Sequence, residues 1–332
     1  MSSKVLFVFD APTATASGAA TELLKTEAFA EDLKVFKVIQ KLGHGVTPFA
    51  IYDNLGELFN EIREGHYDLV FHQAESFRGD RSHEAHLAAF YQLVGVPHTG
   101  ASSEVLTLCA DKSLAKKILH HHRIRTPFFE TFGGDYSLER VSLFPFPGIV
   151  KPLNLEGSEG ISQSSFVATP KEAIARAEWI REKFGVDAIF EEYIDGRELY
   201  VSLLGGKRPA SLPIREHLFG DVDAADPKIA TYNAKWNDEY RKKWGIKNAF
   251  ARNLSPALET KIQSTAKRIA RLLGIHTFAR IDFRMKADGS LYFIEANPNP
   301  CLYADDELAM SAAKAEIEYP ELIQKIIKAA LS

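Results

Sequence analysis

One segment near the C-terminus, residues 278–300, constrains the fold more than any other part of the sequence. It reads FARIDFRMKADGSLYFIEANPNP, with apolar runs on either side of Asp288-Gly289. An Asp-Gly pair between such runs predicts a β-hairpin with a two-residue turn. Outward numbering from that turn brings polar side chains into two opposed pairs: Asp282 with Glu295, and Arg280 with Asn297. Side chains alternate along a strand, so all four share one face of the hairpin.

The opposed carboxylates need an explanation, because like charges placed directly opposite each other destabilise a sheet. One interpretation is a solvent-exposed face on which Arg280 and Arg284 neutralise the acids. The positions in between are apolar, however, and predict a packed opposite face: Ile281, Phe283, Tyr292 and Ile294. Oxygen ligands suit Mg²⁺, which takes the rest of its shell from water and substrate phosphates. We therefore predict a magnesium site, with Mn²⁺ as the alternative metal, on three ligands: Asp282, Glu295 and Asn297.

A metal that holds phosphates predicts basic residues and a glycine-rich loop elsewhere in the chain. Lys151 lies within the apolar run PGIVKPLN, where an unpaired ammonium would be costly. The loop EGSEGI at residues 156–161 follows it, and its backbone amides could surround a phosphate. An ordinary hairpin turn is the alternative for the loop. Lys112, taken alone, is typical of a solvated helix lysine.

The composition places few other limits on the function. The chain has 332 residues, of which 45% are hydrophobic and 25% charged, with a net charge of −4. These values are typical of a globular protein and give no sign of a nucleic-acid or acidic-membrane partner. No apolar run approaches the roughly 18 residues of a membrane-spanning helix. The two cysteines, Cys109 and Cys301, form no metal or redox motif, which favours a reduced, cytoplasmic protein.

The organisation of the chain changes after about residue 100. The first hundred residues alternate strand and helix patterns, which predicts βαβ units and a parallel sheet. Further on, Thr169-Pro170 predicts a helix start, and residues 255–273 form an amphipathic helix pattern. Residues 207–256 show little periodicity, which is usual for a functional or mobile connection. We identify residues 227–246 as a candidate lid, with a plain surface loop as the alternative.

Five motifs, taken in order, resemble the ATP-grasp fold and, within it, the D-alanine–D-alanine ligases: DKSLAKKIL, GIVKPLNLEGSEGIS, IFEEYIDGREL, YNAKW and RIDF…YFIEANPNP. The resemblance implies an α/β protein with a Rossmann-like first domain at residues 1–100. A two-lobed ATP-grasp domain would follow, with a small central lobe at 101–190 and a C-terminal lobe at 191–332. It also implies a homodimer.

The resemblance further implies a role for each matching residue. ATP phosphates would contact four residues: Lys112, Lys151, Gly157 and Ser158. The adenine would meet Glu191 and the backbone of Glu192, Tyr193 and Ile194, with Ile294 beneath the ring, and Glu198 would accept the ribose hydroxyls. Three residues would act in catalysis: Lys235 on the γ-phosphate, Arg280 on the acyl phosphate, and Ser158 in the loop that closes over them. The three hairpin ligands would hold two Mg²⁺ ions.

The chain departs from these ligases where the substrates would bind. The first-domain segment FHQAESFRGDRSHEAH offers different candidates: His72, Glu75, Arg78, Arg81 and Glu84. Trp236 replaces the tyrosine of the mobile loop. After Asn297 the family has Pro-Gly and a serine that binds a carboxylate, whereas this chain has PNPCLYADDEL. Its acids, which would repel a carboxylate and attract a cation, are Asp305, Asp306 and Glu307. An equal alternative is that these acids only begin a helix.

These observations predict an ATP-dependent carboxylate–amine ligase that works through an acyl phosphate and uses an amine other than D-alanine. A D-alanine–D-alanine ligase of cell-wall synthesis is the first alternative. An acyl-phosphate-forming kinase and a non-ligating ATP-binding protein are alternatives of another class. The complete set of predicted lysines and metal ligands argues against the non-catalytic protein.

Overall fold

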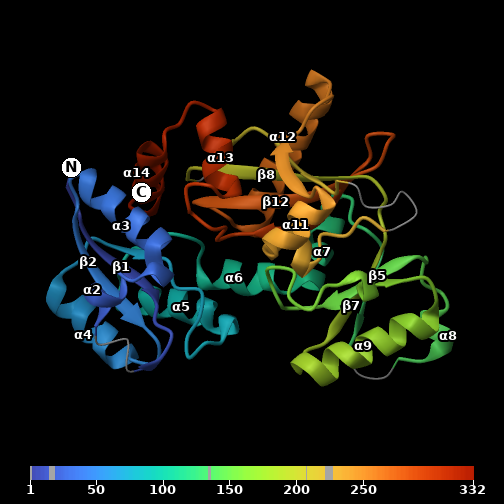
Figure 1. Ribbon diagram of the computed structural model, residues 1–332, viewed down its shortest axis with the longest axis horizontal. Helices are drawn as coiled ribbons and strands as arrows, with labels where there is room; N and C mark the ends of the chain where they lie inside the picture. The colour runs from blue at the N-terminus through green and yellow to red at the C-terminus, as the bar shows by residue number, and fades with distance from the viewer. Residues whose placement is uncertain (1, 15–18, 134–135, 207, 221–226) are drawn as a thin grey trace.

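The computed structural model describes residues 2–14, 19–133, 136–206, 208–220 and 227–332. These residues form three separate sheets, which Figure 1 shows side by side along the long axis of the molecule. Within these ranges, no helix has the length and apolar character needed to cross a membrane. The predicted α/β class, with a parallel sheet first and antiparallel sheets after it, is confirmed.

The first sheet is parallel, with the order β2-β1-β3. Its strands are β1 Lys4–Asp10, β2 Gly45–Ile51 and β3 Leu69–His72. The helices around it are α2 Ala20–Leu23, α3 Ala30–Lys41, α4 Leu55–Gly65 and α5 Glu84–Val94. Residues 5–9 of the central strand are apolar because both faces of the sheet are covered. Asp10 ends this strand, at the edge where parallel sheets of this type bind ligands.

The second sheet is antiparallel, with the order β4-β7-β5-β6. Its strands are β4 Phe129–Phe132, β5 Gly148–Pro152, β6 Phe166–Val167 and β7 Ala188–Glu192. Two helices lead into it from the first sheet, α6 Ser103–Ala110 and α7 Lys112–His121, and two more flank it, α8 Leu138–Val141 and α9 Pro170–Phe184. The predicted start of α9 is confirmed, since the Thr169 side chain accepts a hydrogen bond from the Glu172 N–H. The predicted boundary at residue 190 falls inside β7.

The third and largest sheet has the order β11-β10-β8-β12-β13, with β9 paired to β8. Its strands are β8 Arg197–Leu204, β9 Ala210–Ser211, β10 Arg215–Leu218, β11 Lys247–Phe250, β12 Phe278–Met285 and β13 Leu291–Asn297. The accompanying helices are α10 Tyr232–Trp236, α11 Asp238–Trp244, α12 Pro256–Leu273, α13 Glu307–Lys314 and α14 Tyr319–Ala330. The amphipathic pattern at 255–273 is thus confirmed as α12.

The hairpin β12–β13 has the predicted pairs, Asp282 with Glu295 and Arg280 with Asn297, but its turn differs from the prediction. Lys286 pairs with Ser290 around a three-residue loop, so the register near the turn is one residue out. A β-bulge at Ile294 restores it before the acids are reached. The prediction of the apolar face was wrong for β13, which was expected to pack Tyr292 and Ile294 into the core. The β13 residues in the core are Leu291, Phe293 and Ala296.

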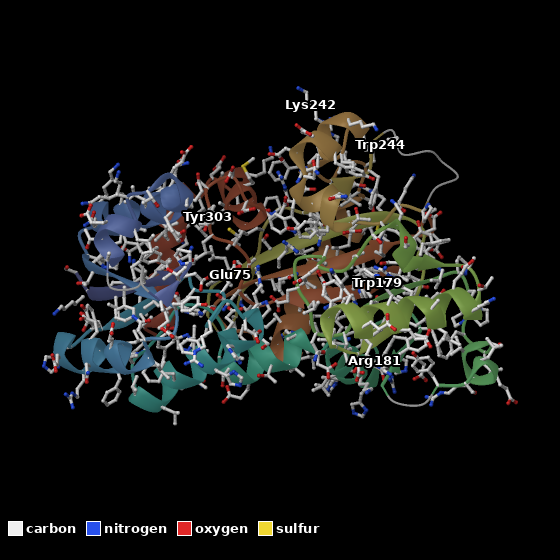
Figure 2. All side chains as sticks on the ribbon, turned by 60° about the horizontal axis from the view of Figure 1, so that its bottom comes forward. Glu75, Trp179, Arg181, Lys242, Trp244 and Tyr303 are labelled. Atoms are coloured by element: carbon white, nitrogen blue, oxygen red, sulfur yellow. The ribbon has the colours of Figure 1, made fainter. Side chains whose placement is uncertain are left out.

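The weakly patterned segment 207–256 contains two strands and two helices where it is described. β10 and β11 extend the large sheet, whereas α10 and α11 form the candidate lid. Figure 2 shows Lys242 and Trp244 of α11 at the outer edge of the molecule. The sequence pattern did not predict β10 and β11, because both strands are short and carry charged residues.

The C-terminal helix α14 completes the core of the first sheet. Leu322 and Ile326 of α14 are fully buried in the same apolar cluster as Phe7 of β1 and Val35 of α3. Figure 1 shows α14 beside α3, with both chain termini near this sheet. The first and last segments of the chain therefore share one core.

Candidate active site

The polar face of β12 and β13 holds a compact set of opposite charges. Arg280 donates from Nε and Nη2 to the two oxygens of Asp282, at 2.8 and 2.9 Å. Lys235 Nζ lies 4.0 Å from Glu295 Oε1. Burial raises the pKa of Glu295, but Lys235, Lys112 and Lys151 together hold that pKa well below its usual range. Glu295 is therefore ionised and faces cations.

The predicted metal ligands lie together on this face. Asn297 Nδ2 lies 3.4 Å from Asp282 Oδ2, and Asp282 and Glu295 are directly opposed. Among the described residues, no group of three or more His, Cys, Asp or Glu side chains is arranged for a metal. Two carboxylates and an amide oxygen fit Mg²⁺, because that ion keeps waters and completes its shell with phosphate oxygens.

A pocket between the two antiparallel sheets adjoins this face, and we call it the inter-sheet pocket. It is lined by 16 residues, of which five decide its chemistry: Lys151, Glu191, Glu198, Ile294 and Glu295. Glu191 Oε1 lies 3.0 Å from Lys151 Nζ and 3.1 Å from Lys116 Nζ. Burial raises the pKa of Glu191, but both lysines outweigh it and the net pKa is lowered. The carboxylate therefore bridges two ammonium groups.

Lys116 is a site residue that the sequence analysis missed. Its side chain is fully buried and also donates to the Ile294 carbonyl. Lys112, four residues earlier on α7, instead donates to the carbonyls of Leu153 and Leu155, at 3.2 and 2.6 Å. Lys112 thus holds the start of the glycine-rich loop. The pairing of Lys116 with Glu191 links α7 to β7, which no local pattern reveals.

The strand β7 and the residues after it form the predicted base-reading segment. The N–H groups of Glu192 and Tyr193 are taken by the carbonyls of Phe128 and Pro147. In the described part of the chain, the Ile194 N–H has no such partner. Of the three hinge amides, Ile194 is therefore the one that can donate to a ligand.

Two further predicted contacts line the inter-sheet pocket. Glu198 pairs with Arg284 at 2.9 Å and accepts from the Tyr200 hydroxyl at 2.7 Å. Ile294 reaches the same pocket as Glu295, its chain neighbour, because the bulge sets both against one residue of β12. The alternation rule alone would have placed them on opposite faces.

The candidate lid lies closed on the glycine-rich loop. Trp236 Nε1 donates to the Gly157 carbonyl at 2.7 Å, and the Tyr232 N–H donates to the Ile161 carbonyl at 3.1 Å. Gly157 and Ser158 both have left-handed backbones, with φ of 60° and 64°. Ser158 is buried and lines the inter-sheet pocket beside Lys235 of the lid. This turn brings loop and lid against the same pocket.

A second space, the central cavity, lies between the inter-sheet pocket and the first sheet. It shares Lys235 and Glu295 with the inter-sheet pocket. Its cationic lining residues come from four separate segments: Arg81, Lys235, Arg241 and Arg280. Sequence reasoning missed Arg241, whose Nη1 donates to the Lys235 carbonyl at 2.9 Å. The cavity also has five acidic lining residues: Glu75, Glu156, Glu295, Asp306 and Glu307. The cations suit a carboxylate or a phosphoryl group.

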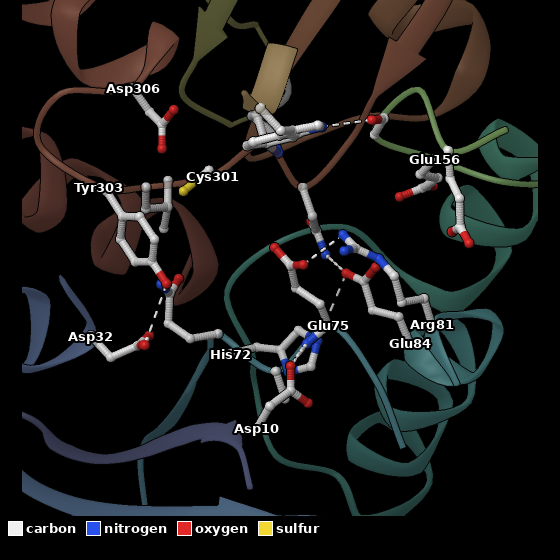
Figure 3. A pocket seen from close by; sticks show the side chains of 18 of the residues that line it. Asp10, Asp32, His72, Glu75, Arg81, Glu84, Glu156, Cys301, Tyr303 and Asp306 are labelled. Atoms are coloured by element: carbon white, nitrogen blue, oxygen red, sulfur yellow. Dashed lines mark hydrogen bonds and ion pairs between the residues drawn. The ribbon is translucent and has the colours of Figure 1, made fainter. Parts of the chain in front are cut away.

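The third and largest space, of about 910 Å³, lies between the first sheet and the segment after β13. We call it the acidic chamber, because seven carboxylates line it: Asp10, Asp32, Glu75, Glu84, Glu156, Glu159 and Asp306. Figure 3 shows Asp32, Asp10 and Glu84 below the chamber and Asp306 above it. The chamber shares Glu75 and Asp306 with the central cavity, so the two spaces adjoin.

The predicted substrate residues divide between these spaces and the surface. Glu75, Trp236 and Asp306 line both the central cavity and the chamber. Arg78 does not line any of the three spaces; it is exposed and lies over the Phe77 ring. Arg81, on the one-turn helix after Asp80, lines the central cavity and the chamber instead.

The acids after Pro300 also differ from one another. Glu307 accepts from Arg215 at 2.9 Å and from Asn248 at 2.6 Å, so its charge is matched. Asp305 is exposed and lines none of the three spaces. Asp306 precedes α13 but makes no side-chain cap. The segment therefore begins the helix α13, and Asp306 also lines the central cavity and the acidic chamber.

Known proteins can now be compared with this geometry. The family model described as "D-ala D-ala ligase C-terminus" matches residues 130–328, more than half of the chain.

The chain belongs to the D-ala D-ala ligase family. It is an ATP-grasp ligase of the ADP-forming kind, as the motifs predicted. Ligases of this family use ATP and divalent metal ions.

Several relatives support this membership. An uncharacterised protein, y4sG, of Sinorhizobium fredii is 28% identical over 79% of this chain and 74% of its own length. The D-alanine–D-alanine ligase of Bordetella petrii is 27% identical over 84% of this chain and 81% of its own length. A Bacillus anthracis D-alanine–D-alanine ligase solved with ATP shares the fold, with a TM-score of 0.72 and 20% identity over 99% of this chain and 98% of its own.

Proposed function

We propose that this ligase joins a carboxylate to an amine through an acyl phosphate, and that its amine acceptor is not D-alanine. The excess of acidic residues in the chamber carries the proposal of a different acceptor. The inter-sheet pocket would hold ATP, the central cavity would hold the carboxylate substrate beside Lys235 and Arg280, and the acidic chamber would deliver the amine.

The inter-sheet pocket has a residue for each part of ATP. The Ile194 N–H would donate to the adenine edge, and Glu198 would accept from the ribose hydroxyls. Lys151, Lys116 and Lys112 would balance the phosphate charge. Asp282, Glu295 and Asn297 would hold magnesium, for which we propose two ions; the metal would spread the negative charge of the phosphates. When ATP binds, Glu191 keeps the lysine heads in place.

The reaction follows from these positions in two steps. A carboxylate oxygen of the first substrate attacks the γ-phosphorus, and the bond from that phosphorus to ADP breaks. The uncharged amine nitrogen then attacks the acyl carbon, phosphate leaves, and the nitrogen loses a proton to form the amide. Arg280 and Lys235 stabilise the negative charge that develops in both steps. The lid, closed through Trp236, excludes water that would hydrolyse the acyl phosphate.

The choice of amine rests on the segment after Asn297. Asp306 faces the cavities from that segment, and the chamber beyond it is lined by six more carboxylates. An amino acid entering as nucleophile would bring its own carboxylate close to these acids, which costs electrostatic energy. An amine without a nearby carboxylate avoids that repulsion.

The test is ADP and phosphate release with Mg²⁺-ATP against paired panels of acids and amines, with mass spectrometry of the products. We expect release to require both an acid and an amine, and D-alanine alone to give no dipeptide. Efficient D-alanyl-D-alanine formation would overturn the assignment of a different acceptor. Stoichiometric ADP release with an acid but no amine would instead make the protein a kinase.

A further inference from the structure

The acidic chamber has many more acidic than basic lining residues. Seven carboxylates line it, and among the described lining residues Arg81 is the single Lys or Arg. Arg81 is already paired with Glu75, at 2.5 Å. Asp10, Asp32 and Glu84 have neutral hydrogen-bond partners in the described contacts. Asp32 is buried, and a buried carboxylate without a cation is costly to maintain.

Asp10 and Asp32 form the innermost part of this charge. Like Glu84 and Glu159, they line the chamber but not the central cavity, whereas the other three acids line both. Asp10 accepts from the N–H groups of Glu75 and Ser76, at 2.9 and 3.1 Å. Asp32 is 8% exposed and accepts from the Tyr303 hydroxyl at 3.3 Å. Figure 3 shows this last contact as a dashed line.

The surroundings of this pair agree with a missing cation. Burial, together with the charges of Asp10 and Glu75, raises the pKa of Asp32 to about 6, although hydrogen bonds from Tyr303 and Gln73 act in the opposite direction. The two acids come from different elements, the end of β1 and the first turn of α3. Neither acid caps a helix through its side chain in the described contacts. The helix dipole favours an acid at Asp32, in the first turn of α3, but it gives no reason for Asp32 to converge with Asp10.

A second observation, independent of the acids, also indicates a ligand. His72 lines the chamber, is 7% exposed, and its Nε2 has no hydrogen-bond partner among the described residues. The other ring nitrogen lies 3.3 Å from the Tyr91 hydroxyl. The free Nε2 is 3.9 Å from Glu84 Oε1, too far for a hydrogen bond. A polar group left unpaired in this way is usual where a ligand or water completes the site.

We propose that the amine acceptor carries a second positive charge, and that Asp10 and Asp32 bind this charge at the inner end of the chamber. The nucleophilic nitrogen then lies toward Asp306 and Glu75, where the chamber meets the central cavity. The second charge stays protonated through the reaction, and only the uncharged nitrogen attacks the acyl phosphate. The aromatic rings of Tyr303 and Trp236 line the passage and suit a cation. This inference rests on the proposed ligase function.

The experiment measures binding of linear diamines from 1,3-diaminopropane to 1,6-diaminohexane to the full-length protein by calorimetry. Each diamine is compared with the monoamine of the same chain length, in the presence of Mg²⁺ and a non-hydrolysable ATP analogue. We expect at least one diamine to bind more than about tenfold tighter than its monoamine, because two acids meet its second charge. Equal binding of every matched pair would overturn the inference.

Two variants and a control locate the preference. Asp32→Asn keeps the size of the side chain and removes its charge, and we expect it to abolish the diamine preference. Asp10→Asn is the second variant, in case the first unfolds. Glu182→Gln makes the same charge change at an exposed position of α9 and should keep the preference. A preference that survives in a folded Asp32→Asn or Asp10→Asn protein would contradict the assigned position.

Failure of this inference can be told apart from failure of the proposed function. Amide formation with a singly charged amine, together with no diamine preference, would overturn the second charge alone. Diamine binding without ADP release from any acid–amine pair would overturn the ligase assignment instead.

Discussion

The inter-sheet pocket and the acidic chamber treat buried charge in opposite ways. In the pocket, each acid faces a cation of the protein: Glu191 faces two lysines, Glu198 faces Arg284, and Glu295 faces Lys235. In the chamber, Asp32 faces a tyrosine hydroxyl and Glu84 faces the Asn299 amide. The pocket is thus prepared for one ligand before it arrives. In the proposed function, the chamber leaves its balancing charge to the ligand, and this is where the substrate would differ from D-alanine.

This contrast predicts that removing one negative charge destabilises the pocket strongly. Glu191→Gln leaves Lys116 and Lys151 buried without their direct ion-pair partner. We expect a loss of about 3–5 kcal/mol in the free energy of unfolding, as for other broken buried pairs. Urea unfolding measures this loss, with Glu182→Gln as the exposed control. A change below about 1 kcal/mol would mean that the lysines do not depend on Glu191.

A second prediction concerns catalysis at the edge of the pocket. Asp282→Asn removes one proposed metal ligand while keeping the size of the side chain. We expect kcat for ADP release to fall on the order of 10²–10³-fold, the usual loss when one charge-stabilising group is removed. The circular dichroism spectrum should be unchanged. Full activity in this variant would exclude Asp282 from the metal site.

The lid gives a third prediction, with a moderate effect. Trp236→Phe removes the hydrogen bond to the Gly157 carbonyl but keeps an aromatic ring. We expect phosphate release without amide formation to rise by up to about tenfold, since one hydrogen bond contributes about 0.5–1.5 kcal/mol to closure. Trp244→Phe, at the outer end of α11, is the control and should leave the ratio of phosphate to amide unchanged.

The last prediction has the opposite sign and lies in the chamber. Burial raises the pKa of Glu84 from an ordinary 4.5 to about 8. Because the folded chain then holds a proton that the unfolded chain has lost, stability falls as pH rises from about 4.5 to 8. Glu84→Gln removes this dependence. We expect its Tm to equal that of the wild type at pH 5 and to exceed it at pH 8, by thermal melts across that range. A lower Tm at pH 8 would show that Glu84 is stabilised as an anion.

The sequence predicts the pocket far better than the chamber. The hairpin ligands, Lys151 and the loop at Gly157 lie in short segments whose patterns have direct physical meaning. Even there, the register of Asp282 and Glu295 is right because two departures cancel: a three-residue turn and a bulge at Ile294. A prediction that assumes regular alternation of side chains along each strand cannot detect two register shifts that cancel.

The chamber could not be predicted because its residues are distant in the sequence. Asp10, Asp32 and Asp306 come from β1, α3 and the segment before α13, and only the packing of the first sheet against that segment brings them together. Arg78 and Arg81 show the same limit on a smaller scale. Both are basic residues of one loop, and the left-handed backbone at Arg78 helps to decide which of them reaches the cavity.

The position of α14 has a consequence for how the protein is made. Leu322 and Ile326 complete the apolar cluster around Phe7, although almost the whole chain separates them. A ribosome that has synthesised only the first hundred residues has therefore not yet supplied the last helix of their core. The first sheet cannot reach its final packing until the residues of α14 have been synthesised, so part of its apolar surface stays uncovered while the intervening segments emerge.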